Sequence, residues 1–331
     1  MSTDSPLIQP LQLSQFDNIR NIIEEYRRGE FQKILNWFIG GFTVAIVVFI
    51  GSILNKSNWD IRGFMLTLFL CLIFPVIITW QIDQAYQKLF TSLLLPEFIK
   101  HFNMENDVEL QCNSLTGISE STFNSCGLFQ QTTDYSSDGL IKGKIGKTTF
   151  ECASVLAQKV PGDAYGKSHQ QTAILFHGLF FIADANKNFN GTTFVIPDYV
   201  ETLFGHTGHS LQELFVRHRF GHCELVSLED PTFERDFAVY SSDQIEARYL
   251  LTPLIMQRIS TVQRSWKHPI HIAFIYDKIF LAIETPQNWF APPSVFSSVT
   301  AEVVQEAHDK ILMMLSLVDE MELNTRIWGR T

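Results

Sequence analysis

Hydrophobic residues concentrate in two uncharged runs near the start of the chain. Residues 34–54 and 63–80 contain no Asp, Glu, Lys or Arg. As a helix, the first run would be about 31 Å long, which matches the hydrocarbon core of a bilayer. Pro75 lies within the second run, where neighbouring helices can satisfy the carbonyl group that a proline frees. The two runs predict a transmembrane hairpin over residues 34–82; buried core helices of a soluble protein are the less favoured interpretation.

Amphipathic patterns flank the two runs. Before the first run and after the second, apolar side chains recur every three or four positions, which is typical of helices with one apolar face. We therefore expect an amphipathic helix within residues 1–33 and a helical stalk over residues 83–104, with an apolar stripe that ends before Pro96. The two stripes are expected to pack against each other; binding of a partner helix is the alternative.

Short segments of alternating character follow from about residue 105. Residues 139–160 predict a strand pair, and residues 172–183, apolar on both faces, predict a central strand. Residues 268–285 predict a hairpin that turns at positions 277–278. Strands joined by hairpins, with helices grouped late in the chain, favour an α+β fold in which a mainly antiparallel sheet with flanking helices occupies residues 105–331.

A polar loop separates the central strand from the next apolar segment. The Asn190-Gly191 pair is typical of a tight turn, and it predicts a hairpin between the flanking strands. The preceding residues Asp184, Asn186 and Lys187 are candidates for a recognition loop. A solubilising hairpin tip is the alternative, and it is the more common role of such loops.

Charge is divided unevenly along the chain. The net charge of −10 comes from residues 101–331, which carry 17 basic and 27 acidic side chains. This acidic region disfavours nucleic acid as a partner, because phosphate backbones repel it. Six basic residues lie outside the two apolar runs and two lie between them: Arg20, Arg27, Arg28, Lys33, Lys88 and Lys100, against Lys56 and Arg62. This excess predicts that both termini are cytoplasmic.

The five cysteines are scattered and lack CxxC spacing, which favours a reducing compartment without a disulfide framework.

The densest group of charged residues is "SLEDPTFERDFAVYSSDQIEARYLLTP", residues 227–253. The pattern favours structural roles: Ser242 or Asp243 caps a helix, Glu246 stands three residues after Asp243 in capping-box register, and Arg248 pairs with an upstream carboxylate. Glu229 and Asp230 precede a proline that ends a strand. Paired-carboxylate catalysis and a divalent-cation site remain open as alternatives, in which Asp230, Glu234, Asp243 and Glu246 would act.

Four histidines offer a second candidate for chemistry. His206, His209, His218 and His222 have spacings that zinc could use, but His206 and His209 lie in a Gly-rich loop and there is no HExxH motif. The sequence contains no GxSxG elbow and no GxGxxG loop. The Lys142-Gly-Lys144 segment lacks phosphate-loop spacing and fits a hairpin edge. The chain is therefore not expected to be an enzyme, and no cofactor is predicted.

Four segments together resemble a known family. They are "GLIKGKIGKTTFE", "GLFFIADANKNFNGTTFVIPD", "LVSLEDPTFERDFAVYSSDQIEARYLLTPLIMQRI" and "ELNTRIW". In this order they resemble the bacterial family catalogued as domain of unknown function 3137, over roughly residues 80–328. The resemblance implies an inner-membrane protein with a cytoplasmic α+β domain, and it implies no reaction. The charges of residues 229–248 belong to the family pattern, whereas the histidines of residues 206–222 do not.

The resemblance also implies a partner, because members of this family are often encoded beside LemA-type membrane proteins. We therefore expect a multi-pass protein of the bacterial inner membrane whose cytoplasmic domain binds or scaffolds a partner. Candidate binding residues are Asp184, Asn186, Lys187, Glu229, Asp230, Asp243, Glu246 and Arg248. The alternative is a metal-dependent hydrolase that uses these carboxylates or the histidines.

Overall fold

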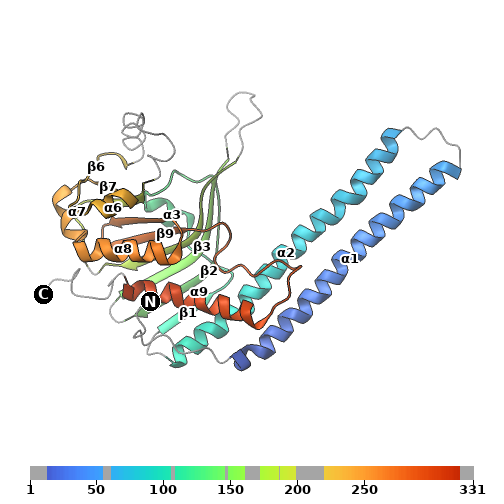
Figure 1. The fold of residues 1–331 in the computed structure, drawn as a ribbon, viewed down its shortest axis with the longest axis horizontal. Helices are drawn as coiled ribbons and strands as arrows, with labels where there is room; N and C mark the ends of the chain where they lie inside the picture. Colours follow the sequence, from blue (N-terminus) through green and yellow to red (C-terminus); the bar gives the residue numbers. More distant parts are fainter. Residues whose placement is uncertain are drawn as a thin grey trace. The chain divides into compact units, whose positions relative to one another are not determined.

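The computed structural model describes residues 13–54, 61–105, 109–145, 148–160, 172–185, 187–198 and 220–320. The chain divides into two compact units, which are described separately here. The sheet unit comprises Leu95–Phe290 and the chain from Asp309 onward. The helical unit comprises Pro10–Leu94 and Ala291–His308. Figure 1 shows the elements of both units.

The described part of the sheet unit contains one nine-stranded sheet, in the order β1-β2-β3-β4-β9-β8-β5-β7-β6. All neighbouring strands pair antiparallel. The strands are β1 Glu109–Asn113, β2 Asp134–Ile145, β3 Thr148–Lys159, β4 Ala173–Asp184, β5 Thr193–Pro197, β6 Glu224–Leu225, β7 Phe237–Ser241, β8 Ile270–Ile275 and β9 Lys278–Glu284. The predicted α+β fold with a mainly antiparallel sheet is confirmed.

Helices cover both faces of the sheet. They are α3 Glu120–Ser125, α6 Pro231–Asp236, α7 Gln244–Leu250, α8 Pro253–Trp266 and, from Asp309 on, the second part of α9 Ala301–Glu320. Cys152 of β3 contacts Met314 of α9, whereas Phe180 of β4 contacts Phe123 of α3. Cys152 pairs with Phe181, the neighbour of Phe180, and successive side chains of a strand point to opposite faces. Thus α3 and α9 lie on opposite faces.

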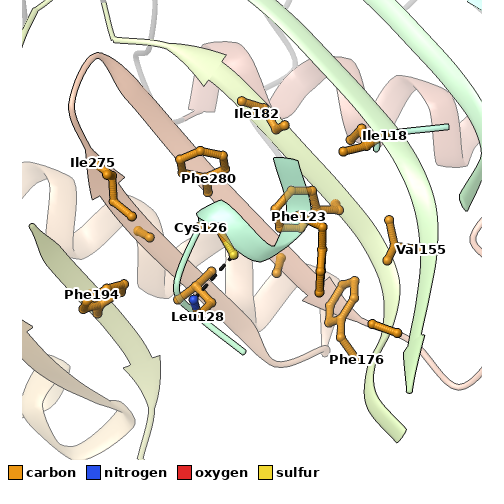
Figure 2. Packing of buried hydrophobic residues seen from close by; sticks show 14 of the residues in the cluster. Ile118, Phe123, Cys126, Leu128, Val155, Phe176, Ile182, Phe194, Ile275 and Phe280 are labelled. Carbon is orange, nitrogen blue, oxygen red and sulfur yellow. Dashed lines mark hydrogen bonds between the residues drawn. The ribbon is translucent and has the colours of Figure 1, made fainter. Parts of the chain in front are cut away.

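The core beneath α3 is aromatic (Figure 2). Phe123 is fully buried, and its ring centroid lies 5.4 Å from that of Phe129, 5.8 Å from that of Phe176 and 5.0 Å from that of Phe180. The helix begins at Ser119, whose side chain accepts a hydrogen bond from the Thr122 amide. A six-residue helix is too short to be stable alone, so this packing is what holds it.

The central strand β4 needs its glycine. Gly178 has φ of +157°, and a Cβ there would lie 1.9 Å from the Ile283 carbonyl oxygen of β9. The backbones of β4 and β9 can therefore approach each other this closely only because residue 178 has no side chain. The β8–β9 hairpin is confirmed, with its turn at Tyr276–Asp277, one residue earlier than predicted.

The predicted hairpin at Asn190-Gly191 is wrong. Strand β4 pairs with β3 and β9, whereas β5 pairs with β7 and β8. The later β8–β9 hairpin is inserted between β4 and β5, so that β9 pairs with β4 and β8 pairs with β5. Residues 185–192 are therefore a crossing connection.

The helical unit contains η1 Leu13–Phe16, α1 Asp17–Leu54 and the part of α2 Ile61–Glu105 up to Leu94. Helix α1 is the one described helix that is long and apolar enough to cross a membrane; its apolar segment has a mean hydropathy of 2.1 and is 11% buried. Helix α2 continues past Pro96 to Glu105, and Phe98, Ile99 and Phe102 are buried, so the apolar stripe does not end before Pro96 as expected.

The two helices approach closely where a glycine meets a proline. A Cβ on Gly41 of α1 would lie 2.9 Å from the Cys71 carbonyl oxygen of α2. This carbonyl is four residues before Pro75, which has no N–H to donate to it. Gly41 therefore allows α1 to pack against the turn of α2 that proline weakens.

Charged side chains hold the residue 291–300 segment to both helices of this unit. The Arg27 guanidinium donates to the Val295 carbonyl at 2.9 Å, and Asp83 Oδ1 accepts from the Val295 amide at 3.1 Å. Glu24 Oε2 accepts from the Val299 amide at 2.9 Å and from Arg27 Nε at 2.8 Å. The hydrogen bonds from Arg27 lower the pKa of Glu24 to about 2. We call Glu24, Arg27 and Asp83 the loop clamp.

Candidate functional site

Carboxylates of the 227–253 segment begin two short helices. Asp230 accepts hydrogen bonds from the Thr232 and Phe233 amides at the start of α6, with Pro231 in the first helical turn. Asp243 does the same for Ile245 and Glu246 at the start of α7. Of the two residues predicted to cap this helix, Ser242 and Asp243, the structure shows Asp243. Helix α6 is an element that the sequence did not predict. Both side chains satisfy amides that a helix leaves unpaired at its N-terminus.

Glu246 has a different role from the one predicted. Its two carboxylate oxygens accept hydrogen bonds from the Asn190 amide at 3.0 Å and the Gly191 amide at 2.7 Å. The predicted capping-box contact back to Asp243 is therefore wrong, because the buried carboxylate turns to the crossing connection instead. The two regions that the sequence singled out separately meet at this residue.

The other end of the same connection is fixed by the β8–β9 turn. The Ala185 amide donates to the Asp277 carbonyl at 2.8 Å, and the Phe189 amide donates to the Tyr276 carbonyl at 2.5 Å. The Phe189 ring packs edge-on against Phe274. Residues 185–191 are thus held at both ends; we call them the clasped loop. It exposes Lys187, while Asn186 lies outside the described residues.

The β8–β9 turn carries a conformationally unusual tyrosine. Tyr276 has φ of +56° and is 77% exposed. A bulky side chain is disfavoured in this left-handed region, where glycine or asparagine is typical. The hydrogen bond from Phe189 to its carbonyl holds the turn in this conformation. Tyr276 is therefore an exposed aromatic residue in a turn that is hydrogen-bonded to the clasped loop.

Other candidate residues contribute less. Glu229 is exposed, and Arg248 donates to the carbonyl and side-chain oxygens of Gln244 at 3.3 Å. The prediction that Arg248 pairs with an upstream carboxylate is wrong, because the Gln244 acceptors lie one turn away on the same helix. Glu234 accepts from the Leu228 amide at 2.6 Å. These contacts fix the local structure of the segment.

The histidine candidates are mostly untested. His206, His209 and His218 lie outside the described residues, and His222 is exposed. Within the described ranges, no three His, Cys, Asp or Glu side chains are grouped so that they could hold a metal ion.

A shallow cavity of about 420 Å³ crosses five strands at one end of the sheet. We call it the charged trough. It brings Asp184, the first of the candidate binding residues, beside polar residues of β1, β2, β3 and β9. Its charged and polar side chains are Glu109, Gln111, Lys142, Lys144, Thr149, Glu151, Asp184 and Lys278. Lys142 and Glu151 form an ion pair across neighbouring strands at 2.8 Å.

Sequence reasoning missed most of the charged trough. A signal is present: polar residues alternate at period two in three strands, as in Lys142 and Lys144 of β2 and Thr149 and Glu151 of β3. Period two places such residues on one face of a strand. The sequence does not show that five of these faces become neighbours.

A second cavity, of about 400 Å³, lies at the other end of β4 and β9. Its lining includes His177, His268 and Glu284. His271 lies behind Glu284, with its Nε2 atom 2.7 Å from the carboxylate. Burial lowers the pKa of His177, which favours its neutral form. These groups offer hydrogen-bond partners to a small polar molecule.

Comparison with known proteins finds one family model that matches part of the chain. It is described as "Protein of unknown function (DUF3137)" and matches residues 174–323. The match confirms the resemblance seen in the sequence. A comparison with curated proteins finds no match.

Among solved structures, the mycobacterial trehalose monomycolate transport factor A, TtfA, is similar over 68% of this chain and 95% of that chain. The sequence identity is 9% and the TM-score is 0.35, a level of similarity that supports no conclusion about function.

Proposed function

We propose that this protein is a bacterial inner-membrane protein that presents the sheet unit to a partner in the cytoplasm. Residues 34–54 and 63–80 form its two membrane spans, and both termini are cytoplasmic. The exposed apolar surface of α1 supports an anchoring role, because such a surface is stable only when something apolar covers it.

The observation that carries the binding role is the use of the Glu246 carboxylate. Both of its oxygens accept hydrogen bonds from backbone amides of the clasped loop, which supports a role in positioning that surface. A loop that is fixed before binding loses little conformational entropy when a partner arrives. The clasped loop, with Lys187, and the neighbouring Tyr276 form the proposed contact surface; tyrosine is enriched among residues that dominate binding energy.

The proposed partner is another membrane protein, and a LemA-type protein is the first candidate. The test is affinity purification of the full tagged chain from native membranes in mild detergent. We expect one membrane protein to copurify in near-stoichiometric amount.

Two matched variants sharpen the test. Glu246→Ala frees the clasped loop and should abolish copurification, whereas Glu229→Ala removes an exposed carboxylate from the same segment and should leave it unchanged. Glu246→Gln retains one acceptor oxygen and should give an intermediate yield. Thermal unfolding of each variant shows whether the sheet unit is still folded.

A chain that purifies alone under repeated gentle extraction would contradict the proposal. So would equal loss of the partner in both alanine variants. Reporter fusions at each terminus, one active only in the cytoplasm and one active only outside it, test the orientation. External activity at both ends would overturn the proposed orientation, and external activity at one end alone would overturn the two-span topology.

A further inference from the structure

We propose that the charged trough is a contact surface for a second copy of this chain, arranged with twofold symmetry about Thr149. This inference goes beyond the proposed function, and it does not depend on the identity of the membrane partner. It follows from the order of charges that the sheet register places side by side.

One row of the charged trough runs straight across five strands. Glu109 pairs with Lys144, and Lys144 pairs with Thr149. Asp184 pairs with Lys278 on the other side. Phe150 pairs with Ala183, so the next position of the same antiparallel register sets Thr149 opposite Asp184. Directly opposed residues of a sheet point to the same face, and all five side chains line the charged trough.

The row therefore has the order acidic, basic, neutral, acidic, basic. All of its members are exposed except Asp184, which is half-buried. Neighbouring strands are about 4.8 Å apart, so the row is an evenly spaced ladder with Thr149 at its centre.

This order is complementary to itself. When a second copy faces the first after rotation about an axis parallel to β3 that passes above Thr149, Glu109 faces Lys278 of the other copy. In the same arrangement, Lys144 faces Asp184 of the other copy. Each opposite-charge contact forms twice, and Thr149 meets its own counterpart without a charge. Glu151, two residues along β3, also meets its own counterpart, and the ion pair with Lys142 offsets its charge in each copy. A twofold contact of this kind uses one patch on both subunits, which is how most homodimers are built.

The expected dimer is weak and sensitive to salt. Exposed ion pairs contribute little individually, and ions screen them at physiological ionic strength. Confinement of two anchored chains to one membrane raises their effective concentration, which compensates for a weak contact. The dimer should therefore be measured in the full chain in its membrane.

The first experiment locates the symmetry axis. Thr149→Cys in the full chain is treated in native membranes with a short bifunctional maleimide. The reagent should give a covalent dimer, because the two substituted residues face each other. Gln111→Cys is the matched control: it lines the same charged trough but lies two strands from the axis, and its two copies would be too far apart. The parent chain, with its five cysteines, gives the background.

The second experiment reverses charges in the Thr149→Cys background. Lys144→Asp sets two acidic groups against each other across the axis, and Asp184→Lys sets two basic groups against each other. Each single change should lower the cross-linked fraction by about fivefold or more, and the double change should restore it. Within one chain, Thr149 separates positions 144 and 184, so the two substituted side chains do not pair with each other. The repulsion from Glu109 or Lys278 on the neighbouring strand is therefore the same in the single and double variants, and only a contact between two copies can restore cross-linking.

Restoration by the double change, with a melting temperature no higher than that of either single variant, supports the proposal. Equal cross-linking at Gln111→Cys and Thr149→Cys would overturn it, as would failure of the double change to restore the dimer. Cross-linking of Thr149→Cys to a different protein would also overturn it and would assign the charged trough to a partner of another sequence. None of these results depends on copurification through the clasped loop.

Discussion

The two units bury and expose their apolar surface in different ways. In the sheet unit, aromatic side chains from α3 and the segment after it pack on aromatic side chains of β4, on one face of the sheet. Polar residues lie on the sheet near the ends of the strands. In the helical unit, α1 leaves most of its apolar segment exposed, while the buried contacts at its base include the charged loop clamp. The sheet unit thus buries apolar side chains in a core, whereas the helical unit exposes apolar side chains along α1 and places charged side chains in its buried contacts.

One carboxylate in each unit nevertheless has a similar structural role. Glu246 in the sheet unit and Glu24 in the helical unit each accept hydrogen bonds from the backbone of a distant loop. Buried carboxylates are costly unless they are paired or hydrogen-bonded, and backbone amides are donors that need no second charge. Glu246 and Glu24 therefore each fix the backbone of a segment that is distant in sequence.

The largest expected effect comes from the aromatic core. Phe123→Ala removes the ring that contacts Phe129, Phe176 and Phe180, and it leaves a cavity under a helix that has little other support. We expect a loss of about 3–5 kcal/mol in the free energy of unfolding of the sheet unit. Denaturant unfolding of the full chain in detergent measures it. A loss below 1 kcal/mol, by the same scale, would mean that α3 is not held by this core.

The loop clamp gives the next effect, and it depends on pH. The pKa of Glu24 is lowered from 4.5 to about 2 in the folded chain, so its stabilisation is complete above pH 4.5 and is lost as the pH falls towards 2. At about 1.4 kcal/mol per pKa unit the shift sets an upper limit of about 3 kcal/mol, and solvent screening at this partly exposed carboxylate reduces the expected contribution to about 2 kcal/mol. Glu24→Gln should lose that stability at pH 7 and show a smaller decline below pH 4.5. Parallel slopes for the two proteins would contradict the assignment.

The clasped loop should respond less strongly. Glu246→Gln replaces one acceptor oxygen by an amide group that cannot accept from a backbone N–H. We expect a loss of about 1–2 kcal/mol, together with faster amide exchange at Asn190 and Gly191. Hydrogen exchange read by mass spectrometry separates this local effect from global unfolding. Unchanged exchange at these two amides would show that the loop is held by the β8–β9 turn alone.

The smallest effect is expected at Arg248. Its contacts are to Gln244 on the same exposed helix surface, so Arg248→Ala should change the free energy of unfolding by less than about 0.5 kcal/mol. Thermal unfolding beside the Glu246 variant provides the comparison. A larger loss would indicate that Arg248 makes a further contact that stabilises the fold.

The sequence by itself determined the local elements. The β8–β9 hairpin follows from alternation over residues 268–285, and the starts of α7 and α8 follow from Asp243 and Thr252, whose side chains accept from amides two or three residues later. The uncharged run within α1 follows from composition alone. The sequence predicts these elements because the interacting groups are only a few residues apart. Their contacts therefore depend on local backbone conformation and little on the rest of the fold.

The tertiary structure decided which distant groups meet. Glu246 satisfies amides that precede it by 55 and 56 residues, and the insertion of β8–β9 between β4 and β5 overrides a turn signal at Asn190-Gly191. The charged trough exists only because five strands pair in one register. A shift by one residue in any of them would turn its charged side chains to the other face. Register and strand order are set by the packing of the whole sheet, so no local pattern contains them.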